Sequence, residues 1–398
     1  MTMRQLRHAA KCVVEPASSL GRTVQLENIE SGCSRLIGDL AVLPPEGQNR
    51  FRRGDVIFSK LRPYLAKSLL VTDSVHGSGE LLCMRPEPAT EARYLAYLTL
   101  SRPWLDHANM TSYGTKMPRT SWEQMASLKI HLPDTGEQRR IADFLDDRVA
   151  RIDQIIAARR TQMDHVDDAL DAEWNSLGAR LVEHGPVIPL RRVLASIVDG
   201  PFGSSLTSSH YTDEGTRVIR LGNIGKAAFR DGDAAFISNQ YAAELRSHSV
   251  SPGDLLMAGL GDERWPLGRC AVAPEDLGPA IVKADCYRIR LDARVRHDFA
   301  AAYISSPRSR AAILLLSRGS TRARLNTDLA RGVELPLVGL EMQREYLRAL
   351  GEARSSNGQA SRLLEGVVHR FREYKQSLIT AAVTGELDVT TAGSGIPG

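Results

Sequence analysis

Two stretches in the first third of the chain concentrate side chains that can bind a polyanion. The segments "SKLRPYLAK" (59–67) and "SYGTKMPRTSW" (112–122) combine basic and aromatic residues on turn-rich backbone. Arginine can form paired hydrogen bonds with a guanine edge, whereas lysine holds phosphates. We therefore predict DNA contacts in this block from Lys60, Arg62, Lys67, Tyr113, Lys116 and Arg119.

The second half of the chain contains a comparable set of loops. The segments are "PFGSSLTSSHY" (201–211), "GDERWPLGR" (261–269) and "SRGSTRARLN" (317–326). An ordinary exposed surface residue is the simpler interpretation of any single position, but their clustering in loops of both blocks favours DNA binding. The predicted contacts here are Ser204, Ser205, Arg264, Arg269, Arg318, Thr321, Arg322 and Arg324.

The charge distribution agrees with two separate DNA-binding blocks. Residues 1–133 carry 17 Lys and Arg against 12 Asp and Glu, and residues 184–336 carry 20 against 16. Residues 134–183 have the opposite balance, 7 against 12. Such modest excesses also occur on ordinary solvated surfaces, so a protein-binding scaffold with incidental basic blocks stays the alternative hypothesis.

The sequence matches none of the familiar catalytic motifs that we considered. A phosphate-binding loop would need glycine at Arg220 and Ser or Thr at Ala227. Asp134 and Glu137 lack the lysine of a nuclease motif and fit a helix N-terminus better. The five cysteines form no C-x-x-C pair, so we expect no metal site. We predict a chain without catalysis or a bound cofactor, leaving open a site assembled from distant residues.

No segment reads as a membrane span. The longest aliphatic run, residues 311–316, is far shorter than a bilayer requires, and the first 16 residues have no apolar signal core. The composition, 42% hydrophobic and 25% charged, is that of a globular protein. We expect a cytoplasmic protein with no membrane partner.

Two long helices must position these loops. From residue 137 to 182 there is no proline, and apolar residues recur at alternating steps of four and three, the spacing of a seam between paired helices. A similar series follows residue 337. The predicted seam residues are Leu145, Val149, Ile152 and Ile156 in the first helix, and Leu350, Leu364, Val367 and Phe371 in the second.

The rest of the chain has an α/β (α+β) pattern that occurs twice. "LENI" (26–29) matches "LGNI" (221–224), "GDVIF" (54–58) matches "GDLLM" (253–257), and "IHLP" (130–133) matches "VELP" (333–336). Their constant order indicates an internal duplication. We predict recognition domains at 1–133 and 184–336, helical spacers at 134–183 and 337–390, and a disordered tail at 391–398.

The simplest packing of two such halves is pseudo-two-fold. The helices would then form an antiparallel coiled coil with one globule at each end. If each globule reads a short half-site about one helical turn of DNA (~34 Å) from the other, the target is split by unread bases. Because the two blocks differ in sequence, the half-sites should differ too.

The whole pattern resembles the specificity subunits of type I restriction-modification systems. The resemblance rests on the helix entrances "LP…EQRRIADFLDDRVARID" and "LP…EMQREYL", on "KLRPYLAK", "YGTKMPR" and "DGPFGSSL", and on the terminal "YKQSLITAAVTGELDV". The second entrance departs from the usual Glu-Gln pair, and the second helix is glycine-rich around "SSNGQ".

This resemblance implies a non-catalytic chain that binds double-stranded DNA through two target recognition domains. Its helices would dock two methyltransferase subunits and two motor/endonuclease subunits. S-adenosylmethionine, ATP and Mg would belong to those partners. Lys116, Pro118 and Arg119 would lie in the DNA-facing loop of the first domain, and Gly319, Ser320, Thr321 and Arg322 in that of the second.

Overall fold

The chain folds into two compact units that each draw on both halves of the sequence. A computed structural model describes residues 3–232, 234–262, 265–316 and 324–391. Unit 1 comprises residues 1–161 and 364–398, and unit 2 comprises residues 162–363. Apart from Thr391, the predicted disordered tail lies outside the described residues.

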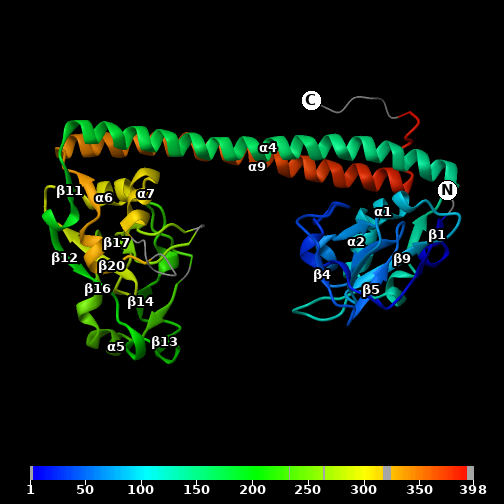
Figure 1. The fold of residues 1–398 in the computed structure, drawn as a ribbon, viewed down its shortest axis with the longest axis horizontal. Helices are drawn as coiled ribbons and strands as arrows, with labels where there is room; N and C mark the ends of the chain where they lie inside the picture. Colours follow the sequence, from blue (N-terminus) through cyan, green and yellow to red (C-terminus); the bar gives the residue numbers. More distant parts are fainter. Residues whose placement is uncertain (1–2, 233, 263–264, 317–323, 392–398) are drawn as a thin grey trace. The chain divides into compact units, whose positions relative to one another are not determined.

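Unit 1 contains two four-stranded sheets and a two-stranded ribbon, with helices against them (Figure 1). The sheet orders are β2-β9-β6-β7 and β4-β3-β8-β5, and the ribbon is β1-β10. The strands are β1 (Met3–Gln5), β2 (Ala10–Cys12), β3 (Gly21–Val24), β4 (Ala41–Leu43), β5 (Gln48–Phe51), β6 (Val56–Ser59), β7 (Ser68–Leu70), β8 (Val75–Ser78), β9 (Leu81–Pro86) and β10 (Lys129–His131). The short helices are α1 (Ala92–Leu100), α2 (Arg102–Met110) and α3 (Trp122–Met125).

The unit 1 core forms where α1 and α2 cover the β6-containing sheet. β6 is buried along its whole length, as a central strand of β-branched and aromatic residues should be. The Phe58 ring meets the buried Trp104 of α2 edge to face, with centroids 5.6 Å apart. α1 ends at Leu100 and α2 begins at Arg102, because Pro103, in the first turn of α2, cannot donate the backbone hydrogen bond that a continuous helix would need there.

Unit 2 repeats this plan with one additional strand, because its second sheet has five strands instead of four. Its sheet orders are β12-β20-β17-β18 and β13-β15-β14-β19-β16, and its ribbon is β11-β21. The strands are β11 (Val187–Pro189), β12 (Leu194–Val198), β13 (Tyr211–Thr212), β14 (Thr216–Ile219), β15 (Phe236–Ile237), β16 (Ser249–Val250), β17 (Leu255–Ala258), β18 (Cys270–Val272), β19 (Ala280–Val282), β20 (Cys286–Leu291) and β21 (Glu334–Pro336). The short helices are α5 (Asn239–Glu244), α6 (His297–Ile304), α7 (Pro307–Leu316) and α8 (Thr327–Arg331).

The predicted repeats perform the same task in both units. Asn28 and Asn223 each accept a hydrogen bond from the backbone N–H three residues earlier, at 3.0 and 2.8 Å. The aspartate of each G-D repeat is buried and paired with an arginine, Asp55 with Arg85 and Asp254 with Arg290. The predicted mixed fold with an internal repeat is therefore confirmed.

Two long helices, α4 (Thr135–His184) and α9 (Leu340–Thr384), pack together within each unit. In unit 1, Ile152 and Ile156 of α4 form an apolar cluster with Val368 of α9. In unit 2, the indole Nε1 of Trp174 donates to the hydroxyl of Tyr346 at 2.8 Å. Later residues of α4 meet earlier residues of α9, so the two helices run antiparallel.

Half of the predicted seam residues are buried and the other half are half-buried, and the second series loses its phase. Leu145, Ile152, Ile156 and Leu350 are at most 6% exposed, whereas Val149, Leu364, Val367 and Phe371 are half-buried. Tyr374, which continues that spacing three residues after Phe371, is 37% exposed, so the seam does not extend to it. Lys375 takes the buried position, and its ammonium lies 2.7 Å from Asp153 and 3.0 Å from the Cys33 sulfur.

A buried glutamine explains why the chain contains the same helix entrance twice. The Gln138 amide donates to the carbonyls of Ala89 and Pro133 and accepts from the Glu91 N–H, just ahead of α1. Gln343 repeats this pattern, donating to Arg294 and Val338 and accepting from the Arg296 N–H ahead of α6. The second helix entrance, "GLEMQ", therefore retains the glutamine. In each unit this glutamine connects the start of the long helix to the backbone ahead of a short helix.

Candidate nucleic-acid interface

A tight loop at 113–119 presents the first group of predicted DNA contacts. Tyr113 and Arg119 close it by exchanging two backbone hydrogen bonds, both 2.9 Å long. Gly114 adopts φ +88°, a conformation that other residues rarely tolerate, and an added Cβ would lie 3.1 Å from the Met117 carbonyl. Tyr113 and Lys116 are exposed on this loop.

The loop at 59–67 lies directly beside it. The Arg62 N–H donates to the Pro118 carbonyl at 2.7 Å, and the Thr120 N–H donates to the Lys60 carbonyl at 3.0 Å. Arg62 itself is exposed and has the left-handed φ of +49°. These bonds unite Lys60, Arg62, Lys116 and Arg119 in one place, as expected of a binding surface built from distant loops.

Lys67 does not join this surface. Its ammonium donates to the backbone carbonyl of Leu26, and its side chain is half-buried. We therefore assign Lys67 to holding the loop rather than to DNA contact. Two exposed apolar residues, Tyr64 (55% exposed) and Met117 (50% exposed), flank the basic side chains instead.

A carboxylate that the sequence analysis missed lies at the centre of these loops. Glu80 accepts two hydrogen bonds from the Arg119 guanidinium, from Nε at 3.1 Å and from Nη2 at 3.2 Å. Its backbone carbonyl accepts from the Lys60 N–H at 2.9 Å. The side chains of Glu80 and Arg119 are both 38% exposed, so the ion pair faces solvent.

Unit 2 builds the same ion pair at the equivalent place. Arg324 lies 205 residues after Arg119, and Asp285 lies 205 residues after Glu80. The Arg324 guanidinium bonds the Asp285 carboxylate through Nε at 2.9 Å and Nη2 at 2.8 Å. This fixed spacing was the signal that could have revealed both acids from the sequence.

A second aspartate supports Asp285. The Asp199 carboxylate accepts from the N–H groups of Gly200 and Asp285, at 2.7 and 2.9 Å. It thereby helps to hold Asp285 at a left-handed φ of +64°. Burial raises the pKa of Asp199 to about 6, because these bonds and the Arg324 charge compensate its desolvation only partly. Gly200 is required here, since a Cβ would lie 2.1 Å from the Lys283 carbonyl carbon.

The "DGPFGSSL" loop continues from Asp199 to the predicted serine contacts. Ser204 and Ser205 are exposed, and the Ser205 carbonyl accepts from the Tyr241 hydroxyl at 2.7 Å. Phe202 is 49% exposed and lies against the Arg324 guanidinium, 5.7 Å from ring centroid to Cζ. The loop therefore places polar and aromatic groups beside the ion pair of unit 2.

The prediction that Arg269 contacts DNA is corrected by its burial. Arg269 is 3% exposed, and its guanidinium donates to backbone carbonyls including those of Leu221, Ile224 and Leu260. Desolvation lowers its pKa from the ordinary value. Because its guanidinium is buried and bonded to these loop carbonyls, Arg269 cannot contact a base. Arg264, Arg318, Thr321 and Arg322 lie outside the described residues.

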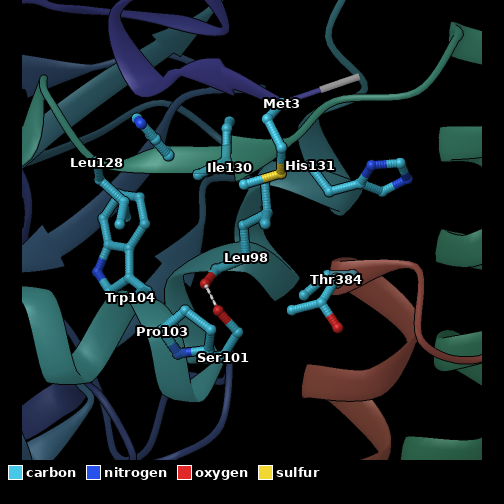
Figure 2. A pocket seen from close by; sticks show the side chains of 11 residues that line it. Met3, Leu98, Ser101, Pro103, Trp104, Leu128, Ile130, His131 and Thr384 are labelled. Atoms are coloured by element: carbon cyan, nitrogen blue, oxygen red, sulfur yellow. Dashed lines mark hydrogen bonds between the residues drawn. The ribbon is translucent and has the colours of Figure 1, made fainter. Parts of the chain in front are cut away.

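Figure 2 shows an apolar pocket of unit 1 where the end of α9 meets α1, α2 and the β1-β10 ribbon. Its volume is about 110 Å³. The Ser101 hydroxyl donates to the Leu98 carbonyl at 2.7 Å, and the His131 ring is turned away from it (Figure 2). We interpret this pocket as a packing gap rather than as a reactive site.

Two searches of the described residues were negative. Within 3–232, 234–262, 265–316 and 324–391, no group of three or more His, Cys, Asp or Glu is arranged to hold a metal ion. Among the helices of the same residues, none is long and apolar enough to cross a membrane.

Comparisons with known proteins point to one family. A family model described as the type I restriction modification DNA specificity domain matches residues 43–163. The specificity subunit of the type I restriction enzyme EcoDI from Escherichia coli is 25% identical over 153 residues. That match covers 38% of this chain and 32% of the relative, so the chain spans about a third of the relative's length.

Solved structures share the fold over nearly the whole chain. A chain from a structural study of complex assembly and conformational transition in the type I R-M system has a TM-score of 0.70 and 18% identity, covering 97% of this chain and 98% of that one. The HsdS subunit of Thermoanaerobacter tengcongensis has a TM-score of 0.46 and 18% identity, covering 97% of both chains. Residues 43–163 thus match the type I restriction modification DNA specificity domain family, and the chain shares its fold with a chain of a type I R-M system.

Proposed function

We propose that this chain is the DNA-recognition subunit of a type I restriction-modification complex and reads a split duplex target. Each unit would read one half of the target through its own loops. One observation carries the proposal: in each unit a solvent-accessible arginine pairs with a carboxylate at the equivalent position, framed by equivalent backbone hydrogen bonds. The residues around the pairs differ, so the two half-sites should differ.

The chemistry would belong to partner subunits. We propose that this chain binds no cofactor and that two methyltransferase and two motor/endonuclease subunits supply the sites for S-adenosylmethionine, ATP and Mg. We propose the α4–α9 pair as the docking surface for such partners; Leu363 of α9 is 64% exposed there and accessible to a partner.

The test is a selection of duplexes from a randomised pool with the purified 398-residue chain, followed by affinity measurements at increasing salt. We expect a gapped consensus, with affinity falling steeply with salt because phosphate contacts release counterions. Arg119→Ala should weaken the preference at one half of the consensus, by about 1–3 kcal/mol if Arg119 contacts a base.

Three outcomes would contradict the proposal. A pool without enrichment would favour the alternative of a protein-binding scaffold. A consensus without a gap would contradict the split target. An equal loss at both halves in Arg119→Ala would contradict the assignment of one unit to one half-site. Arg102→Ala is a suitable control, because this exposed arginine is not part of either recognition loop and its guanidinium pairs with Asp106 of its own helix.

A further inference from the structure

We propose that Glu80 and Asp285 are specificity-determining positioning residues, each orienting one arginine toward a guanine of its half-site. The inference rests on the proposed function and deepens it. It predicts a G·C pair in each half of the target, read by Arg119 in one half and by Arg324 in the other.

The ion pair in unit 1 leaves the outer edge of the guanidinium free. Glu80 uses the Nε and Nη2 side of Arg119, with one oxygen on each nitrogen. Arginine has five N–H donors, and two are taken here. The remaining donors, on Nη1 and on the outer side of Nη2, form the two-pronged edge that matches guanine O6 and N7.

Unit 2 uses the same nitrogens of its arginine. Arg324 bonds Asp285 through Nε and Nη2, so the same outer edge is turned away from the acid. The shorter aspartate accepts both bonds on Oδ1. Glu80 and Asp285 differ in length, yet each bonds the same side of its arginine and leaves the same outer edge for another partner. This agreement between the two units indicates that the outer edge has a function.

The backbone fixes the two members of each pair in equivalent positions. In unit 1 the Glu80 carbonyl accepts from Lys60, whose own carbonyl accepts from Thr120, the residue after Arg119. In unit 2 the Asp285 carbonyl accepts from Gly259 at 2.7 Å, and the Gly259 carbonyl accepts from Leu325 at 2.8 Å. Each arginine and its acid are therefore tied to the same intervening strand end.

A carboxylate on a DNA-binding surface has two physical consequences. It removes rotamer freedom from a long side chain, so less entropy is lost when the guanidinium meets a base. It also cancels the arginine's charge, which weakens attraction to any phosphate while leaving directional donors for a base edge. The pair therefore favours discrimination between sequences over affinity for all of them.

The test uses the 398-residue chain and the duplex selected from the random pool. Each G·C pair of the first half-site is replaced in turn by A·T, and the loss of affinity is measured. The pair that Arg119 contacts is the one whose replacement weakens binding of the wild type but not of Arg119→Ala. We expect Glu80→Gln to lower the discrimination at that pair about tenfold. Affinity for an unrelated duplex should rise, because a negative charge is lost from the surface.

Matched variants separate orientation from charge and from folding. Glu46→Gln removes an exposed acid of the same unit without touching Arg119 and should leave discrimination unchanged. Glu80→Asp keeps the charge and should retain more discrimination than Glu80→Gln. Asp285→Asn should reproduce the loss at the other half-site only, which tests the same inference should Glu80→Gln fail to fold.

The outcomes distinguish this inference from the proposed function. If the wild-type chain prefers its selected duplex and Glu80→Gln and Asp285→Asn discriminate as well as it does, the positioning role is refuted while the proposed function stands. If the selected half-sites contain no G·C pair sensitive to Arg119 or Arg324, the inference is also refuted. If the wild type prefers no duplex at all, the proposed function itself fails.

Discussion

Replacing Asp153 by asparagine should destabilise unit 1 more than any exposed charge change would. The Lys375 ammonium, 7% exposed, lies 2.7 Å from the Asp153 carboxylate, 18% exposed. Removing one member of a buried ion pair typically costs about 3–5 kcal/mol, because the other charge stays desolvated. Unit 1 consists of residues 1–161 and 364–398. For a domain of that size, each kcal/mol lowers Tm by about 2–4 °C, so a fall of roughly 10 °C is expected.

The pH dependence provides a second, sharper test. Burial opposes the charge of Lys375, but the interactions with the Asp153 carboxylate and the Cys33 sulfur together outweigh it and raise the pKa of Lys375 above its ordinary value. The ion pair therefore stabilises the wild type fully below about pH 10 and less as pH rises further. In Asp153→Asn burial acts without this partner and lowers that pKa, so the stability deficit should shrink between about pH 7 and pH 10.

Thermal unfolding followed by circular dichroism and calorimetry would measure both effects. Asp168→Asn, an exposed acid on the same helix, serves as the matched control and should shift Tm by less than about 2 °C. The reasoning is refuted if Asp153→Asn unfolds within 2 °C of the wild type at pH 7, or if its deficit grows as pH rises.

Three further predictions concern residues that hold the fold. Gln343→Ala leaves the Arg296 N–H and two carbonyls unpaired, so urea unfolding should show a loss of about 2–4 kcal/mol. Gln343→Glu should lose at least as much, because a buried carboxylate cannot donate to the two carbonyls. Arg269→Met should destabilise unit 2 by about 2–4 kcal/mol without changing the salt dependence of DNA binding, which a direct DNA contact would change. Burial opposes the ionisation of Asp55, but bonds from Arg85 outweigh it and lower its pKa, so its stabilisation is present above about pH 4 and lost as pH falls. Asp55→Asn should therefore lose stability at pH 7, with a gap to wild type that narrows by pH 3 in urea titrations.

The internal repeat made much of the fold predictable from the sequence. Hydrophobic spacing indicated both long helices, and repeated short motifs indicated two globules of one design. The repeated runs "GDVIF" and "GDLLM" extend into β6 and β17, where burial on both faces demands continuous apolar residues. The strands β4 and β5 carry a weaker signal, since "AVL" is only three residues long and "QNRF" is mostly polar.

The interface was harder to predict, because the charge of a residue does not reveal whether its side chain points to solvent or into the protein. Arg269 and Arg119 look alike in sequence, yet one joins buried loops and the other faces solvent. Counting basic residues also overlooked Glu80, whose role depends on its distance from Arg119 in space. The seam series failed at Tyr374 for a similar reason, since Lys375 finds a carboxylate in the packed helices that the sequence does not place beside it.

The polar contacts between the long helices are not the same in the two units. Trp174 and Lys375 occupy the same position of the repeat, yet one donates to a tyrosine hydroxyl and the other to an aspartate. An α9 helix beside a second α9 would leave each lysine without its acid, so pairing between like helices is penalised. If the chain reads a split target as proposed, pairing between unlike helices keeps its two units different, and a bound chain would then have a defined polarity along the duplex.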